Sequence, residues 1–187
     1  MRVVALEEHF TLPAAVAKYV RPEAIAKRGH YKGRKVAPGK QSPMELLPEF
    51  GEKRFKSMDD AGITMQVLSN SGPGPDLVPG ADGVTMTREI NDYLAGVVTK
   101  NPKRFAGFAA LPMAAPDKCA DELRRAVKDL KFVGAMIHGT CENRFLDHPS
   151  YDSLLAGAEE LDVPIYIHPN VPMLEVHAPN HISRKSR

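Results

Sequence analysis

The residues best suited to chemistry are a Glu-Glu-His run near the N-terminus, Glu7 to His9, and two histidines that end short apolar runs, His138 and His168. Alternate side chains of a β-strand share a face, so Glu7 and His9 point the same way and Glu8 the opposite way. Their Cα atoms are about 6.5–7 Å apart, which lets a carboxylate and an imidazole converge on one metal ion with bonds of about 2.0–2.2 Å. His168 ends a second buried apolar run, which is where a third ligand would have to stand. The pattern therefore favours a metal site that joins Glu7 and His9 to a strand-end histidine such as His168, and His138 ends its strand in a similar place.

Simpler interpretations of these residues stay open. A single Glu-x-His often arises by chance or at the edge of a core, and a strand-end histidine more often makes a structural hydrogen bond than binds a ligand. We expect His138 to be a substrate-binding residue, with a structural role as the alternative. Cys141 beside it could form a nucleophile pair with His138, but no third residue that would orient the pair is evident.

Five short, apolar, β-rich runs must position these side chains. Segments with helical periodicity alternate with them, and this order predicts an α/β fold of about five βα units with a parallel sheet and right-handed crossovers. In such folds the carboxyl ends of the strands carry the site. The runs cover residues 3–10, 64–69, 105–111, 133–138 and 163–168, and the helical segments lie around residues 55–62, 87–98, 116–130 and 150–161.

Two segments break this alternation. Residues 21–49 form a long insertion rich in lysine and arginine, which we expect to be a lid or substrate loop that attracts a small anionic molecule. A solvated surface loop is the alternative, and a nucleic-acid interface is disfavoured because Tyr31 is its one stacking ring. Residues 173–187 lack helical periodicity. The expected organisation is therefore one unit over residues 1–172 followed by an atypical tail.

Composition excludes several classes of protein. The chain has 187 residues, of which 43% are hydrophobic and 26% charged, and its net charge of +2 does not indicate a nucleic-acid binder. Two cysteines without a Cys-x-x-Cys pair exclude a disulfide scaffold and a cysteine-rich zinc site. No run approaches the ~18 apolar residues of a membrane span, and the first apolar stretch is too short for a signal peptide. We therefore expect no membrane association and a cytoplasmic location.

The chain resembles a known family in several places. The segment Val-Ala-Leu-Glu-Glu-His-Phe over residues 4–10 resembles the opening of the amidohydrolase-related metal enzymes. The branch it looks most like is that of the aromatic-acid decarboxylases, which act on γ-resorcylate, 2,3-dihydroxybenzoate or aminocarboxymuconate semialdehyde. Further matches follow in the same order at residues 58–63, 102–112, 132–135 and 161–169.

This resemblance implies a (β/α)₈ barrel with one divalent metal ion, zinc or manganese, at its carboxyl-terminal mouth. It makes Glu7 and His9 the ligands from the first strand and His168 the ligand from the fifth. Many relatives begin with His-x-His, and Glu-x-His favours the decarboxylase branch. The implied reaction is decarboxylation of a small hydroxy-aromatic acid, and a metal-dependent hydrolase or hydratase of the same superfamily is the alternative.

One departure from the family concerns length. A full barrel needs at least ~200 residues, and members of the family also use a histidine from strand six and an aspartate from strand eight. Both positions lie beyond residue 187, so the catalytic residues are unknown. We expect a partial barrel, about the first five βα units, and a non-catalytic remnant is a further alternative. Because exposed strand edges favour association, we expect a homo-oligomer.

Overall fold

The five predicted strands form in a computed structural model that describes residues 1–26 and 41–169. They are β1 (Val4–Phe10), β2 (Met65–Asn70), β3 (Phe105–Gly107), β4 (Ala135–His138) and β5 (Ile165–His168). Strand β2 pairs in parallel with both β1 and β3, and β4 pairs in parallel with β5. A parallel bridge between Ala109 and Ala135 links the two sheets in chain order. The structure is therefore mixed α/β with parallel strands, as the sequence predicts.

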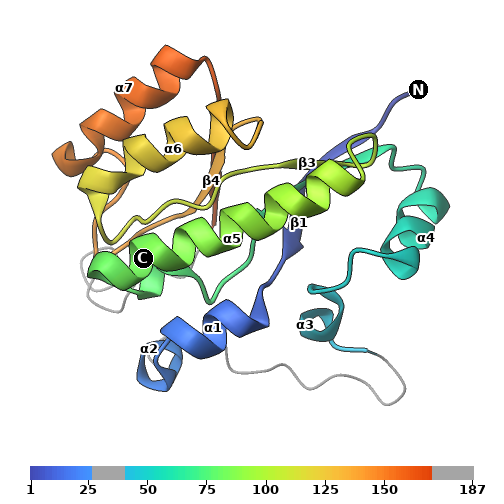
Figure 1. Cartoon of the computed structure of the whole chain (residues 1–187), viewed down its shortest axis with the longest axis horizontal. Coiled ribbons are helices and arrows are strands. Elements are labelled where there is room, and N and C mark those ends of the chain that lie inside the picture. The colour runs from blue at the N-terminus through green and yellow to red at the C-terminus, as the bar shows by residue number, and fades with distance from the viewer. Residues whose placement is uncertain (27–40, 170–187) are drawn as a thin grey trace, which may run out of the picture.

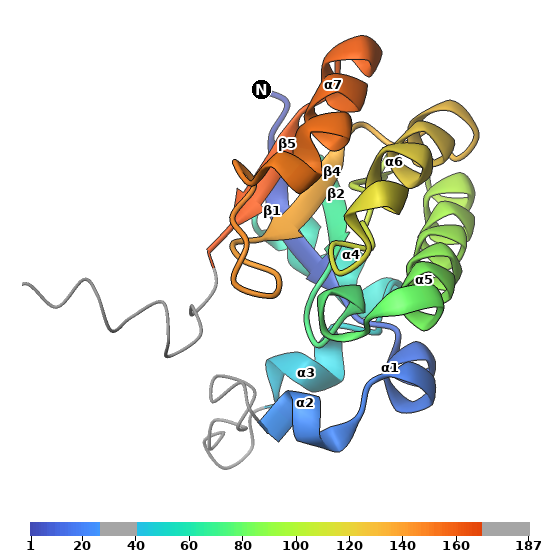
Figure 2. The same cartoon turned by 90° about the vertical axis from the view of Figure 1, so that its left-hand side faces the viewer.

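Helices separate the strands and cover their outer side. Figures 1 and 2 show α5 (Gly80–Lys100), α6 (Cys119–Lys128) and α7 (Asp152–Leu161) together on one side of the strands. Helix α4 (Glu52–Asp60) precedes β2, and short 3₁₀ turns at Pro75–Leu77, Pro116–Lys118 and Pro149–Tyr151 follow strands β2, β3 and β4. Among the described helices, none combines the length and the apolar character that crossing a membrane requires.

Three further helices were not expected from the sequence. Helix α1 (Pro13–Tyr19) follows β1, and α2 (Pro22–Ala26) and α3 (Pro43–Leu46) lie within the segment 21–49, where a loop was predicted. Each begins with a proline, whose fixed φ and missing N–H suit the first helical position. The middle of that basic insertion, residues 27–40, and the segment 173–187 lie outside the described residues.

The core fills the space between the strands and α5, α6 and α7. Phe10, Leu68, Leu94 and Leu123 are fully buried there. The buried Asn91 of α5 connects these layers, because its amide hydrogen-bonds both backbone groups of Ala110 and the carboxylate of Glu122 on α6. This packing holds the strands on the side that faces the helices. The functional side chains lie at the carboxyl ends of the strands.

Candidate metal centre

Strand β1 carries the first two predicted ligands, and its backbone is irregular where they stand. Ala5 pairs with Gln66 but Glu8 pairs with Leu68, so Leu6 and Glu7 stand opposite one residue of β2. This is a β-bulge, a feature that re-aims side chains and occurs often beside active sites. Strict alternation along β1 is therefore interrupted at Glu7, yet the carboxylate of Glu7 and the ring of His9 are brought together.

The third predicted ligand comes from β5, which does not pair with β1. Candidate ligand atoms of Glu7, His9 and His168 all lie within 4.8 Å of one another. His168 Nε2 is 3.3 Å from Glu7 Oε1, and the rings of His9 and His168 are 5.0 Å apart in an edge-to-face arrangement. Within residues 1–26 and 41–169, no other group of three His, Cys, Asp or Glu side chains converges in this way.

The buried Ser69 of β2 fixes the orientation of the His9 ring. Ser69 Oγ lies 3.0 Å from His9 Nδ1 and donates its proton to the carbonyl of Glu8 at 3.3 Å. Because that hydroxyl has one proton, its oxygen is left to accept a hydrogen bond from Nδ1–H. The network therefore assigns the Nδ1–H tautomer to His9 and leaves the Nε2 lone pair for a ligand bond.

The charge states of Glu7 and His9 suit a cation. Burial, reinforced by the nearby His168 and His138, lowers the pKa of His9 to about 4, so its imidazole is neutral at pH 7. The hydroxyl of Tyr166, at 2.7 Å from Glu7 Oε2, and the nearby histidines lower the pKa of the Glu7 carboxyl. An ionised carboxylate and a neutral imidazole are the forms that bind metals.

These residues fit a divalent ion. His168 Nδ1 is buried and has no hydrogen-bond partner among the described residues. One carboxylate oxygen and two imidazole nitrogens are donors that zinc and manganese both accept, so the donor set does not select between them. A bond to Nε2 of His168, which is 3.3 Å from Glu7 Oε1, would keep the ion close to Glu7.

His138 lies beside this group without belonging to it. It pairs directly with His168 in the β4–β5 register, and the two rings are 5.5 Å apart. It also lines a small cavity of about 20 Å³ that includes Asn70 and Asp76. The side chain therefore stands at the carboxyl-terminal edge of the strands, next to the three converging candidate ligands.

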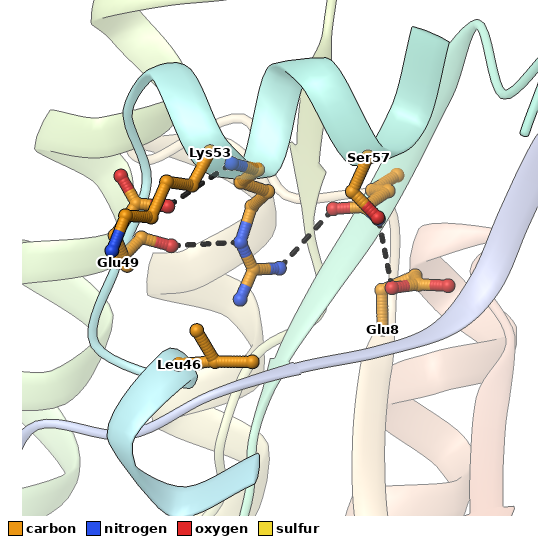
Figure 3. Close-up of a pocket in the computed structure, with 7 residues that line it drawn as sticks. Glu8, Leu46, Glu49, Lys53 and Ser57 are labelled. Atoms are coloured by element: carbon orange, nitrogen blue, oxygen red, sulfur yellow. Dashed lines mark hydrogen bonds between the residues drawn. The ribbon is translucent and has the colours of Figure 1, made fainter. Parts of the chain in front are cut away.

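Glu8 belongs to a different environment on the other side of β1. Its carboxylate accepts a hydrogen bond of 2.8 Å from Gln66 Nε2, and burial raises the pKa of Glu8. It lines a cavity of about 190 Å³ together with Glu49, Lys53 and Ser57, shown in Figure 3. Glu8 is thus separated from Glu7 and His9, as the alternation of the strand predicts.

Sequence reasoning missed Ser69 and Tyr166, although both carry a detectable signal. Tyr166 stands two residues before His168 in the same strand, so the period that relates Glu7 to His9 also places Tyr166 on the face of His168. Ser69 stands at the end of the second predicted strand, the edge at which the ligands gather.

Comparison with known proteins identifies the family. The family model described as Amidohydrolase matches residues 9–183. The chain belongs to the amidohydrolase family. Among curated relatives of this amidohydrolase, gamma-resorcylate decarboxylase of Rhodococcus jostii (strain RHA1) is 35% identical over 180 residues, which are 91% of this chain and 51% of that relative. The resemblance to hydroxy-aromatic acid decarboxylases is therefore confirmed.

Solved structures agree with this assignment. A 2,6-dihydroxybenzoate decarboxylase complexed with 2,6-dihydroxybenzoate has a TM-score of 0.75 at 33% identity, over 94% of this chain and 52% of that one. A dihydroxybenzoic acid decarboxylase from Polaromonas sp. JS666, with bound manganese and the inhibitor 2-nitroresorcinol, has a TM-score of 0.74 at 31% identity, over 95% and 52%. The chain spans about half the length of the curated relatives it matches.

Proposed function

We propose that this chain supplies the metal-binding part of a decarboxylase that acts on a small hydroxy-aromatic carboxylic acid. The observation that carries the proposal is the convergence of Glu7, His9 and His168 within 4.8 Å from two strands far apart in the sequence. The curated relatives are decarboxylases, which supports decarboxylation over hydrolysis, and manganese in a relative's structure supports a divalent ion.

The proposed architecture is about the first five βα units of a (β/α)₈ barrel. Five parallel strands follow one another in chain order, and the ligands stand at their carboxyl-terminal side. This is the edge at which barrel enzymes carry their sites. The similarity to amidohydrolase structures over about half their length supports this arrangement.

The described residues define what the protein contributes to such a site. Glu7, His9 and His168 would hold a zinc or manganese ion, which when bound supplies positive charge that attracts and polarises the oxygens of an anionic substrate. Ser69 holds the His9 ring, and Tyr166 keeps the Glu7 carboxyl ionised by donating a hydrogen bond. We propose that His138, whose ring lies 5.5 Å from that of His168, contacts the substrate carboxylate or hydroxyl.

Metal content measured on the purified chain tests the site. We expect about one zinc or manganese ion per chain in the wild type, and its loss in each of Glu7→Ala, His9→Ala and His168→Ala. The matched control is His148→Ala, because His148 is exposed and bonds to Ser150 in the turn before α7. Equal metal content in the wild type and the three ligand variants would refute the assignment.

Binding of 2,6-dihydroxybenzoate to the metal-loaded chain tests the substrate class. We expect the compound to bind, and His138→Ala to weaken this binding while the metal is retained. A His138→Ala variant with unchanged binding would remove His138 from the proposed substrate site. Loss of metal from that variant would instead give His138 a role in the metal centre.

A further inference from the structure

The guanidinium of Arg54 lies behind the metal centre, on the side of β1 that carries Glu8. Arg54 stands in α4 and is half-buried between that helix, β1 and β2. It lines the cavity shown in Figure 3, where a chain of hydrogen bonds runs from Glu49 through Arg54 and Gln66 to Glu8.

Three hydrogen bonds hold Arg54 in one position. Its Nε donates to the carbonyl of Glu49 at 2.8 Å, and one terminal nitrogen donates to Gln66 Oε1 at 3.1 Å. The other terminal nitrogen donates to the backbone carbonyl of His9 at 2.9 Å. The planar guanidinium presents its donors in a fixed fork, so these three acceptors are held in one geometry.

The backbone carbonyl of His9 does not face β2 and is not hydrogen-bonded by it. Phe10 O accepts a hydrogen bond from Ser71 N beyond β2. Successive carbonyls along a strand point to opposite sides, so the carbonyl of His9 is turned away from β2. Arg54 therefore fixes the backbone of His9 from one side, while Ser69 fixes its ring from the other.

We propose that Arg54 is a positioning residue of the metal centre, which sets the place of the ligand His9 by binding its carbonyl. The inference rests on the proposed function, because it requires that His9 binds a metal. Because the carbonyl of His9 is turned away from β2, its hydrogen bond to Arg54 ties this part of β1 to α4. Groups that orient a metal ligand from outside commonly change metal affinity 10–100-fold when removed.

The test compares Arg54→Met, Arg54→Lys and a matched arginine variant, Arg104→Met. Arg104 also contacts α4, through a 2.7 Å bond to Asp59 and through the ring of Phe55, but none of its hydrogen bonds among the described residues reaches β1. The dissociation constant of Mn²⁺ or Zn²⁺ is measured by competition with a chelator, and the unfolding of the metal-free chain is followed in urea. The second measurement separates metal affinity from loss of the fold.

We expect Arg54→Met to weaken metal binding 10–100-fold and Arg54→Lys to weaken it less, since a lysine retains the charge but not the three-way fork. Arg104→Met should change affinity by less than about twofold. If the wild type binds metal and both Arg54 variants bind it equally well, the inference is wrong while the metal site stands. If neither Arg54 variant folds and Arg104→Met does, Arg54 serves the fold rather than the site, which also overturns the inference. A wild type without metal refutes the proposed function itself.

Discussion

Ser69→Ala tests how strongly one hydroxyl group supports the proposed metal centre. The side chain of Ser69 is fully buried, and its oxygen connects the ring of His9 to the carbonyl of Glu8. The substitution removes that oxygen and leaves Nδ1–H of His9 without the acceptor that selects its tautomer. Both a metal ligand and the bulged strand lose a fixed partner.

The magnitude follows from these two contacts. A buried donor or acceptor left without a partner costs about 1–3 kcal/mol, so the metal-free chain should lose about 1–3 kcal/mol in its free energy of unfolding. Loss of an outer partner of a ligand histidine weakens metal binding about 10–100-fold, which corresponds to about 1.4–2.7 kcal/mol. Urea denaturation measures the first quantity, and chelator competition with Mn²⁺ or Zn²⁺ measures the second.

Thr87→Val is the matched control. Thr87 is also fully buried, and its hydroxyl donates to the carbonyl of Gly83 within α5 at 2.7 Å. We expect this variant to lose about 1 kcal/mol of stability with no change in metal affinity. If Ser69→Ala and Thr87→Val lower stability equally and neither changes metal affinity, the assignment of His9 Nε2 as a ligand held through Ser69 is refuted.

Three further outcomes can be measured. Tyr166→Phe should raise the pKa of Glu7 towards 4.5. It should weaken metal binding by less than about tenfold, because water can replace the phenol at a half-exposed carboxylate. A larger loss of metal affinity in the chelator assay contradicts this prediction. Glu122→Ala should lower the free energy of unfolding in urea by about 1–3 kcal/mol, because the buried amide of Asn91 loses an acceptor while Arg125 keeps its ion pair with Asp92. An unchanged free energy of unfolding contradicts it. Burial raises the pKa of the Cys119 thiol from 9.0 to about 12, so the unfolded chain ionises first and stability falls as pH rises above about 9. Cys119→Ala should flatten that fall between pH 9 and 10, and an unchanged slope contradicts it.

The sequence predicts the strands and the candidate ligand residues from short-range patterns. Glu7 and His9 are two residues apart, a spacing that predicts one face of a strand, and the two side chains come together although β1 is bulged beside them. His168 is recognisable because it ends an apolar run. Their convergence rests on the order of five parallel strands, which the alternation of strand and helix indicates.

Other features depend on contacts between distant residues. The predicted third strand extends to residue 111, but β3 ends at Gly107 because the backbone of Ala109 pairs with β4 instead of β2. The bulge in β1 is a matter of register, which no residue type in that strand signals. From the sequence, Arg54 is expected to be an ordinary charged residue on a helix surface. Its hydrogen bond to the carbonyl of His9 becomes visible only in the folded structure, where α4 lies against β1.

The separation of the ligands along the chain has a consequence during synthesis. Glu7 and Tyr166, which share a hydrogen bond beside the proposed metal, are 159 positions apart. At about 5–20 residues per second, roughly 8–30 s pass on the ribosome between the appearance of the first ligand strand and that of the last. An ion held by Glu7, His9 and His168 together would therefore bind only after the fifth strand has been made, and it would then tie the first strand to the fifth.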